Sequence, residues 1–253
     1  MNERIAQIAR DTRELGICPG DTVLVHSSLK SLGKGVTPED VIRGLGMAVG
    51  ESGTLMFPAL SYFSCNREHP HFDYHRSPSN VGAIPEYFRT EVDGVVRSMN
   101  PTHSCCALGR YAEELTKDHW QDHTPCGANS PYRRLYELSG KILFIGCGTR
   151  CNTSMHAVEE LVRPPYLFSD MVHYTTEDRY GNEGTAACIA HDFHGVDQRY
   201  DRLLPLLPEG AAAQGRIGPA DAVWMDARAV WDTAVQWYRA DSWYFVDRRE
   251  PKE

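Results

Sequence analysis

The sequence predicts an α/β protein in which a central mixed sheet is flanked by helices. Three short, strongly apolar segments support this prediction: TVLVH at 22–26, TLMFP at 54–58 and KILFIG at 141–146. Apolar runs of this length between turn residues are typical of buried strands. Segments with helical spacing alternate with them along the first two thirds of the chain, and this alternation is the pattern of an α/β domain.

The length of the chain favours one large domain. It has 253 residues, of which 42% are hydrophobic, and it contains neither an internal repeat nor a low-complexity linker. We therefore expect a single continuous domain, with a main body at 1–166 and a smaller C-terminal lobe at 167–253.

The first third of the chain begins with an amphipathic helix at 2–15, which leads into the strand at 22–26. A second helix at 39–49 precedes the strand at 54–58. The stretch 61–79 is long, irregular and rich in aromatic and polar residues. Since a loop of this length in a compact domain is usually either functional or disordered, and its aromatic content argues against disorder, we interpret it as one wall of a binding pocket.

The middle third continues the alternation of helices and strands. We expect a helix at 82–91, strands at 95–98 and 105–109, and two further helices at 110–117 and 131–138. Beyond Pro165 the pattern loosens, and two antiparallel strands at 172–176 and 184–190 turn around Tyr180-Gly181-Asn182. After these strands we expect the start of a helix at 197–207 and a small-residue loop at 210–218. The last long helix is expected within 220–237, and the tail at 247–253 is expected to be frayed.

Charge and hydropathy exclude several classes of protein. The formal net charge of −8 argues against nucleic acid and anionic membrane surfaces as partners, and it suits a cationic small molecule. No apolar run approaches the length of a membrane span, and the N-terminal segment lacks the apolar core of a signal peptide. We therefore expect a cytoplasmic protein.

Eight cysteines are present, and without an export signal we expect reduced thiols rather than a disulfide framework. A zinc site formed by Cys147 and Cys151 with Cys126 or His156 is the alternative. The chain has no C-x-x-C spacing to support it, so we expect no metal. A cysteine nucleophile is also disfavoured, because no cysteine lies in a recognisably activated setting.

Two polar turns follow predicted strands. The first, HSSLKSLG at 26–33, offers serine hydroxyls and backbone N–H groups to an anion or a carbonyl oxygen. The alternative is a turn whose serines satisfy its own backbone. The second, NPTHS at 100–104, is similar in composition.

His156 and Glu159 are the strongest candidates for chemistry. The predicted helix at 153–162 follows the strand 141–146, so His156 lies in the first helical turn at the mouth of a strand–loop–helix unit. Glu159 follows at i+3 and shares a face with it. The pair suits a general base with an orienting carboxylate, while the alternative is an ordinary pair on a helix surface.

Together, these segments resemble the aminoglycoside 3-N-acetyltransferase family, whose fold is unrelated to that of the GNAT acetyltransferases. The resemblance is carried, in family order, by LVHSSLKSLG (24–33), GTLMFPALSY (53–62), FDYHRSPSNVGAIPEYFR (72–89), VRSMNPTHSCCALG (96–109) and SPYRRLYELSGKILFIGCGTRCNTSMHAVEE (130–160). It covers roughly the first two thirds of the chain.

The resemblance implies direct transfer of an acetyl group from acetyl-CoA to the 3-amino group of an aminoglycoside in a ternary complex. It implies that the N-T-x-x-H-x-x-E segment places the catalytic dyad on His156 and Glu159. It assigns 1–166 to acetyl-CoA binding and catalysis, and the CoA contacts to His26, Ser27, Ser28, Leu29, Ser31, Arg97, Ser98, His103 and Ser104. Asn100 stands where many members carry histidine.

The segment 167–253 is then the acceptor side. A polycationic acceptor needs ionised carboxylates, and the expected contacts are Tyr62, Asp73, Glu160 and Asp192. Two other functions remain open: N-acetylation of an amino sugar or nucleotide-sugar in polysaccharide or secondary-metabolite synthesis, and binding of CoA without turnover. A homodimer is compatible with the sequence, which does not determine the number of subunits.

Overall fold

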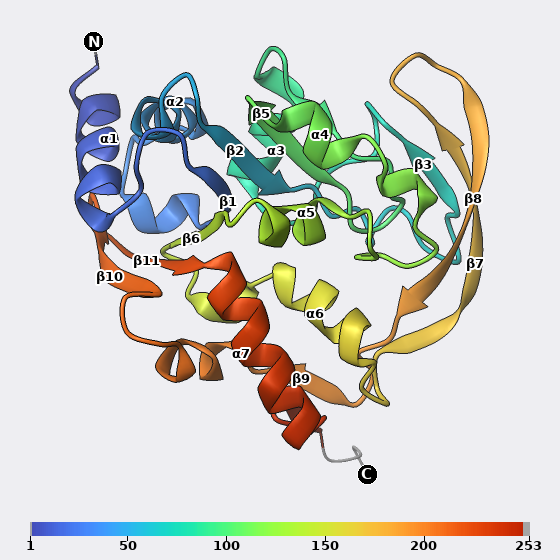
Figure 1. The fold of residues 1–253 in the computed structure, drawn as a ribbon. Helices are drawn as coiled ribbons and strands as arrows, with labels where there is room; N and C mark the ends of the chain where they lie inside the picture. Colours follow the sequence, from blue (N-terminus) through green and yellow to red (C-terminus); the bar gives the residue numbers. More distant parts are fainter. Residues whose placement is uncertain (1, 250–253) are drawn as a thin grey trace.

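The structure is a computed structural model that describes residues 2–249. Its centre is a seven-stranded sheet with the strand order β10-β11-β6-β1-β2-β5-β4 (Figure 1). β1 pairs in parallel with β2 and β6, and the other pairings in this sheet are antiparallel. The predicted mixed sheet is therefore confirmed. Its strands are β1 (Thr22–Ser27), β2 (Thr54–Pro58), β4 (Val96–Arg97), β5 (Cys105–Gly109), β6 (Lys141–Ile145), β10 (Ala212–Ile217) and β11 (Ala220–Asp226).

Helices cover both faces of this sheet. One face packs against α1 (Glu3–Leu15), α2 (Pro38–Val49) and α3 (Ala83–Glu91). The other packs against α4 (Ala112–Thr116), α5 (Pro131–Glu137), α6 (Ser154–Val162) and α7 (Ala227–Ala240). None of the described helices combines the length and the apolar composition that crossing a membrane requires.

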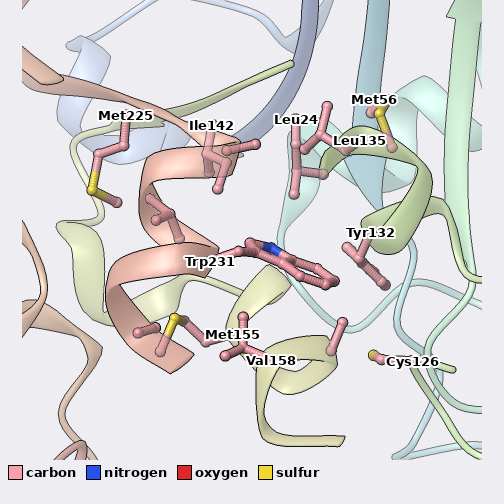
Figure 2. Packing of buried hydrophobic residues seen from close by; sticks show 14 of the residues in the cluster. Leu24, Met56, Cys126, Tyr132, Leu135, Ile142, Met155, Val158, Met225 and Trp231 are labelled. Atoms are coloured by element: carbon pink, nitrogen blue, oxygen red, sulfur yellow. The ribbon is translucent and has the colours of Figure 1, made fainter. Parts of the chain in front are cut away.

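The sheet separates two apolar clusters, and strand alternation explains the division. In β1, Val23 and Val25 belong to the cluster under α1, α2 and α3, whereas Leu24 belongs to the cluster on the opposite face. Burial on both faces accounts for the uninterrupted apolar run of this strand. In Figure 2, Trp231 of α7 lies between Tyr132 of α5 and the α6 residues Met155 and Val158, so these three helices share one core.

The helix starts follow capping rules that the sequence carries. Asn2 accepts a hydrogen bond from the Arg4 N–H at the start of α1. Thr37 and Asp40 form a reciprocal capping box at the start of α2, with Pro38 as the first helical residue. The predicted helices at 2–15 and 39–49 are therefore confirmed to within one or two residues.

The predictions for 197–237 were largely wrong. The expected helix start at 197–207 contains the short strand β9 (Val196–Gln198) and two 3-10 turns, Tyr200–Arg202 and Leu204–Leu206. The expected loop at 210–218 contains β10, and 220–226 is β11, so only α7 is helical. Strand pairing explains why 220–226 is a strand, since β11 lies between β6 and β10. In this position Ala222 and Met225 face the apolar clusters on opposite sides of the sheet.

The segment 167–253, expected to form a lobe, divides between two places. β10, β11 and α7 belong to the main body. By contrast, β7 (Phe168–Glu177) and β8 (Glu183–His191) form a hairpin that pairs with β3 (His71–Asp73) beside it (Figure 1). β12 (Val246–Arg248) pairs with β9, so this part of the expected frayed tail is ordered, and residues 250–253 lie outside the described residues.

Candidate active site

His156 lies in the first turn of α6, directly after a tight connection from β6. Gly146 and Gly148 have φ values of 65° and 69°, which favour glycine, and a 3-10 turn at Thr149–Cys151 follows. The side chain of Asn152 then accepts hydrogen bonds from the backbone N–H and the hydroxyl of Ser154. Asn152 thereby fixes the backbone at the start of the helix.

Glu159 holds one nitrogen of the His156 ring. The distance between His156 Nδ1 and Glu159 Oε2 is 3.1 Å, and the glutamate side chain is fully buried. Three tyrosine hydroxyls also donate to its carboxylate: Tyr200 to Oε2 at 2.8 Å, and Tyr166 and Tyr238 to Oε1 at 3.0 and 2.9 Å. A buried carboxylate needs this many donors, because no water replaces them.

This network assigns the tautomer of His156. Tyr200 donates to Glu159, and its hydroxyl oxygen also lies 3.1 Å from His156 Nδ1. Both the carboxylate and this oxygen can therefore accept from Nδ1, and we assign the ring hydrogen to Nδ1. The other ring nitrogen, Nε2, then has its lone pair available. Among residues 2–249, no side chain or backbone group forms a hydrogen bond with Nε2. The arrangement suits a general base oriented by a carboxylate.

Two neighbouring cavities meet at the start of α6. The larger, of about 580 Å³, is lined by His156 and by residues of the 60–67 loop, the β7–β8 hairpin and the Tyr200 turn. The smaller, of about 140 Å³, lies at the end of β1 and is lined by His26, Ser27 and Pro58. Thr153 borders both cavities, so the two are adjacent and lie on either side of this residue.

Two further histidines face His156 in the larger cavity. The rings of His103 and His191 each lie 5.5 Å from the His156 ring, centre to centre. Burial lowers the pKa of His191 to about 3, and it also lowers the pKa of His103 well below its usual value. Both rings are therefore neutral at physiological pH, and neither adds positive charge beside His156.

Glu160 supports His191 rather than lining the cavity. Its Oε1 lies 2.7 Å from His191 Nε2 and accepts the Cys126 N–H, while Oε2 accepts the Thr124 hydroxyl. Burial raises the pKa of Glu160 to about 7. Its side chain is buried and engaged within the protein, which does not favour the acceptor contact expected from the sequence.

The first polar turn divides between two roles. His26 stacks on Phe144, with ring centres 5.1 Å apart, and burial lowers its pKa to about 3. His26 Nε2 and Ser27 Oγ are buried without a hydrogen-bond partner among the described residues. In contrast, Ser31 donates to the Ser28 carbonyl, as in the alternative of a turn that satisfies its own backbone. Leu29 packs against the apolar core.

Arg97 does not face a cofactor, which corrects the expectation from the sequence. All five guanidinium N–H donors bind inside the protein, at the carbonyls of Ala59, Tyr74 and Ser77 and the hydroxyls of Ser61 and Ser104.

The other residues of the second turn are also engaged within the fold. Ser104 also donates to the Ala59 carbonyl, and Ser98 Oγ accepts the Cys105 N–H and bonds to His119. The side chain of Asn100 accepts the N–H groups of Thr102 and His103, so it shapes the turn. Of the contacts predicted in this turn, only His103 lines the larger cavity, and its Nδ1 lies 2.9 Å from the Thr102 hydroxyl.

The predicted acceptor carboxylates are not in the cavity. Asp73 is buried and accepts the N–H groups of His75 and Arg76, and Asp192 is exposed and accepts the His194 N–H. Tyr62 does line the larger cavity, as expected. Among the described residues that line it, none is Asp or Glu, and two are arginines, Arg67 and Arg150.

Cys147 and Cys151 lie together, but the remaining members of the alternative zinc site do not join them. Cys126 is buried under α5 and α6, in the core cluster. Within residues 2–249, no group of three or more His, Cys, Asp or Glu side chains is arranged to hold a metal ion.

The sequence reasoning missed four side chains of this site. His191 lies at the end of β8, and Tyr166, Tyr200 and Tyr238 come from a loop, a 3-10 turn and α7. Their spacing along the chain carries no motif. The weak signal available was the concentration of histidines and aromatic residues after Pro165, in the part of the chain with the least regular pattern.

Comparison with known proteins agrees with this geometry. A family model described as aminoglycoside 3-N-acetyltransferase matches residues 24–239. The aminoglycoside N(3)-acetyltransferase VII of Streptomyces paromomycinus is 32% identical over 265 residues, which cover 91% of this chain and 90% of that protein. The aminoglycoside N(3)-acetyltransferase IX of Micromonospora chalcea is 30% identical, and the match covers 93% of each.

Solved structures extend the likeness to the whole fold. A structure of AAC-IIIb in a binary complex with CoASH has a TM-score of 0.82 and 26% identity, covering 98% of each chain. A mutant of aminoglycoside acetyltransferase AAC(3)-IVa in complex with a gentamicin has a TM-score of 0.80 and 27% identity, covering 96% of this chain and 90% of that one. The resemblance read from the sequence is confirmed, and the chain belongs to the aminoglycoside 3-N-acetyltransferase family.

Proposed function

We propose that this protein transfers the acetyl group of acetyl-CoA to the 3-amino group of an aminoglycoside. The observation that carries the proposal is the His156 ring, which Glu159 holds by one nitrogen while the ring lines a cavity of about 580 Å³. Family membership supports both substrates, because relatives are named aminoglycoside N(3)-acetyltransferases and one solved relative contains CoASH.

In the proposed mechanism, the nitrogen of the acceptor amine bonds to the thioester carbonyl carbon while His156 Nε2 takes a proton from that amine. The carbon–sulfur bond then breaks, and the thiolate that leaves receives the proton from the imidazolium. Glu159 stabilises the transient positive charge through Nδ1–H. Since both substrates lie in one complex, the protein contributes by orienting them, and no covalent bond to the enzyme forms.

The smaller cavity suits the pantetheine arm of acetyl-CoA. His26 Nε2 and Ser27 Oγ, in its lining, are buried polar atoms without a hydrogen-bond partner among the described residues, and Asn152 Nδ2 is another in the lining of the larger cavity. Such atoms are costly to bury unpaired, and the amide groups of a pantetheine chain would pair with them. We therefore retain His26 and Ser27 as cofactor contacts and add Asn152.

A second candidate acceptor follows from the charge of the larger cavity. Its described lining contains Arg67 and Arg150 but no carboxylate, which is unfavourable for a polycation and favourable for an amino sugar that carries a phosphate. Arg67 is paired with Asp170 at 3.4 Å, so part of its charge is compensated. A nucleotide-linked amino sugar is therefore the rival acceptor.

Measurement of thiol release from acetyl-CoA across an acceptor panel separates these proposals. The panel would contain gentamicin, kanamycin-type and apramycin-type aminoglycosides, simple amino sugars and nucleotide-linked amino sugars. Release with aminoglycosides, with acetylation mapped to the 3-amino group, supports the first proposal. Release only with the phosphorylated amino sugars supports the second, and silence throughout would indicate a binding protein without turnover.

The cytoplasmic location and the homodimer expected from the sequence stay predictions. Light scattering on the purified protein would measure the number of subunits. Fractionation of cells that express the full chain would measure the location.

A further inference from the structure

Cys147 and Cys151 form a close pair at the start of α6. Cys147 follows β6 and is partly exposed, whereas Cys151 ends the 3-10 turn at Thr149–Cys151 and is exposed. Their sulfur atoms lie 3.0 Å apart, about 1 Å more than the roughly 2.05 Å of a disulfide bond. A small movement of the turn would therefore join them.

The environment of this pair differs from that of the other cysteines. Cys65, Cys105, Cys106, Cys126 and Cys188 are buried, and Cys18 lies alone at the surface beyond α1. Burial raises the pKa of Cys106 to about 11 and that of Cys188 to about 12. At Cys147 the pKa is lowered instead, because the Cys151 thiol donates to its sulfur. Cys147 is thus the better nucleophile, and Cys151 lies close enough to act as the resolving thiol.

The pair also borders the cavities described above. Both cysteines line the smaller cavity with His26 and Ser27, and Cys151 lines the larger one as well. A change of bonding at these sulfurs would therefore move the wall that separates the proposed pantetheine site from His156.

We propose that Cys147 and Cys151 form a thiol–disulfide exchange site for low-molecular-weight disulfides, and that its oxidation weakens acetyl-CoA binding. The Cys147 thiolate attacks one sulfur of the disulfide and expels a thiolate, which takes a proton from water. Cys151 then loses its proton and attacks the Cys147 sulfur, which releases the second small thiol. The protein gains one disulfide bond and the oxidant is reduced to two thiols.

The effect on binding follows from the position of the turn. Closing the bond draws Cys151 towards Cys147, and Asn152 and Thr153 follow directly in the chain. Thr153 lines both cavities, and Asn152 lines the larger one. This part of the inference rests on the proposed function, whereas formation of the disulfide does not.

Oxidised glutathione tests the exchange site directly. The full protein is incubated with it in the presence of a chelator, and peptide mapping then follows free thiols and mixed disulfides. We expect a Cys147–Cys151 disulfide in the native protein. Cys151→Ser should stop at a glutathione adduct on Cys147, and Cys147→Ser should lose most reactivity at 151.

Cys18→Ser is the matched control, because Cys18 is exposed and remote from the pair. It should form the internal disulfide at the native rate. If the native protein acquires glutathione at Cys18 while Cys147 and Cys151 both stay reduced, the exchange site is refuted.

Calorimetry with acetyl-CoA tests the second half of the proposal. We expect the oxidised protein to bind on the order of tenfold more weakly than the same sample after reduction with dithiothreitol, with no such difference in Cys147→Ser. Equal affinity in both redox states would refute the effect on binding. Absence of acetyl-CoA binding to the reduced protein would instead count against the proposed function, and the disulfide mapping would still decide the exchange site.

Discussion

Glu159 is a buried acid whose surroundings explain its burial. Three tyrosine hydroxyls and the His156 ring all bond to its two oxygens, so removal from water leaves neither oxygen unsatisfied. These donors come from a loop, a 3-10 turn and two helices. The orientation of a single imidazole therefore depends on several elements of the fold, and substitution of single residues can test it.

Replacing His156 with alanine should remove the base. We expect kcat to fall by about a hundredfold or more, with little change in the dissociation constant for acetyl-CoA, because the ring acts on the acceptor amine. Steady-state kinetics and calorimetry on the same preparation measure both quantities. His194→Ala is the matched control, since His194 is exposed and does not line the cavity. A rate near that of the native protein would remove His156 as the base.

Replacing Glu159 with glutamine keeps the size of the side chain but changes its hydrogen bonding. An amide accepts at one end only, so at least one of the present donors loses its partner. We expect kcat to fall by about tenfold or more, though less than for His156→Ala, with a native-like circular dichroism spectrum. Tyr200→Phe removes one donor and keeps the carboxylate, so its effect should be smaller. The reverse order of the two effects would contradict the assigned roles.

At the scale of elements, Arg97 anchors the long connection between β2 and α3. Its guanidinium group binds carbonyls and hydroxyls at 59, 61, 74 and 77 and lies over the Phe72 ring at 4.7 Å. This connection carries Tyr62 and β3, and β3 in turn pairs with β7. One buried side chain on a short edge strand thus positions a wall of the cavity.

The anchoring role predicts a large loss of stability in Arg97→Lys. A lysine has three donors on one atom and cannot reach the five acceptors of the planar group. We expect the free energy of unfolding in urea to fall by about 3 kcal/mol. Arg110→Lys should change it by less than about 0.5 kcal/mol, because Arg110 is exposed. Equal stability of the two variants would show that the Arg97 network contributes little.

At the scale of the whole molecule, the fold buries several histidines in the neutral state. Burial lowers the pKa of His26, His119 and His191 to about 3 each, from an ordinary value of 6.5. At pH values between these two pKa values, the histidines of the unfolded chain bind more protons than those of the folded protein. The stability from these groups is therefore complete above about pH 6.5 and is lost as the pH falls towards 3.

Glu160 acts in the opposite direction. Its pKa is raised by burial from 4.5 to about 7, so its contribution is present at low pH and is lost as the pH rises through this range. This single carboxyl group opposes four buried histidines, since burial also lowers the pKa of His103. The net expectation is therefore that the protein loses stability on acidification.

Urea unfolding at a series of pH values measures this dependence. We expect the free energy of unfolding to decrease steadily from about pH 6.5 downwards. His119→Gln should flatten the decrease, because this histidine is fully buried, while His194→Gln at the surface should not. A stability that is constant from about pH 7 to about pH 4 would contradict the neutral, buried state of these rings.

The sequence by itself determined the α/β class, the strands β1, β2 and β6, the helix that carries His156, and the family. These features depend on local patterns: apolar runs, capping residues and the i, i+3 spacing of His156 and Glu159. The same local reasoning expected Arg97, Asp73 and Glu160 to face ligands, whereas all three bind groups within the protein. A charged residue near a turn has the same local sequence pattern in both cases.

Tertiary structure alone decided the rest. It placed β10 and β11 in the central sheet, although the sequence pattern at 210–218 is that of a loop. The pairing of β10 with β11, and of β11 with β6, outweighs the weak strand preference of small residues. It also brought Tyr166, Tyr200 and Tyr238 to Glu159 across up to 79 positions of the chain. Contacts between distant segments leave no periodic signal in a sequence, so only the folded structure shows which side chains bind Glu159.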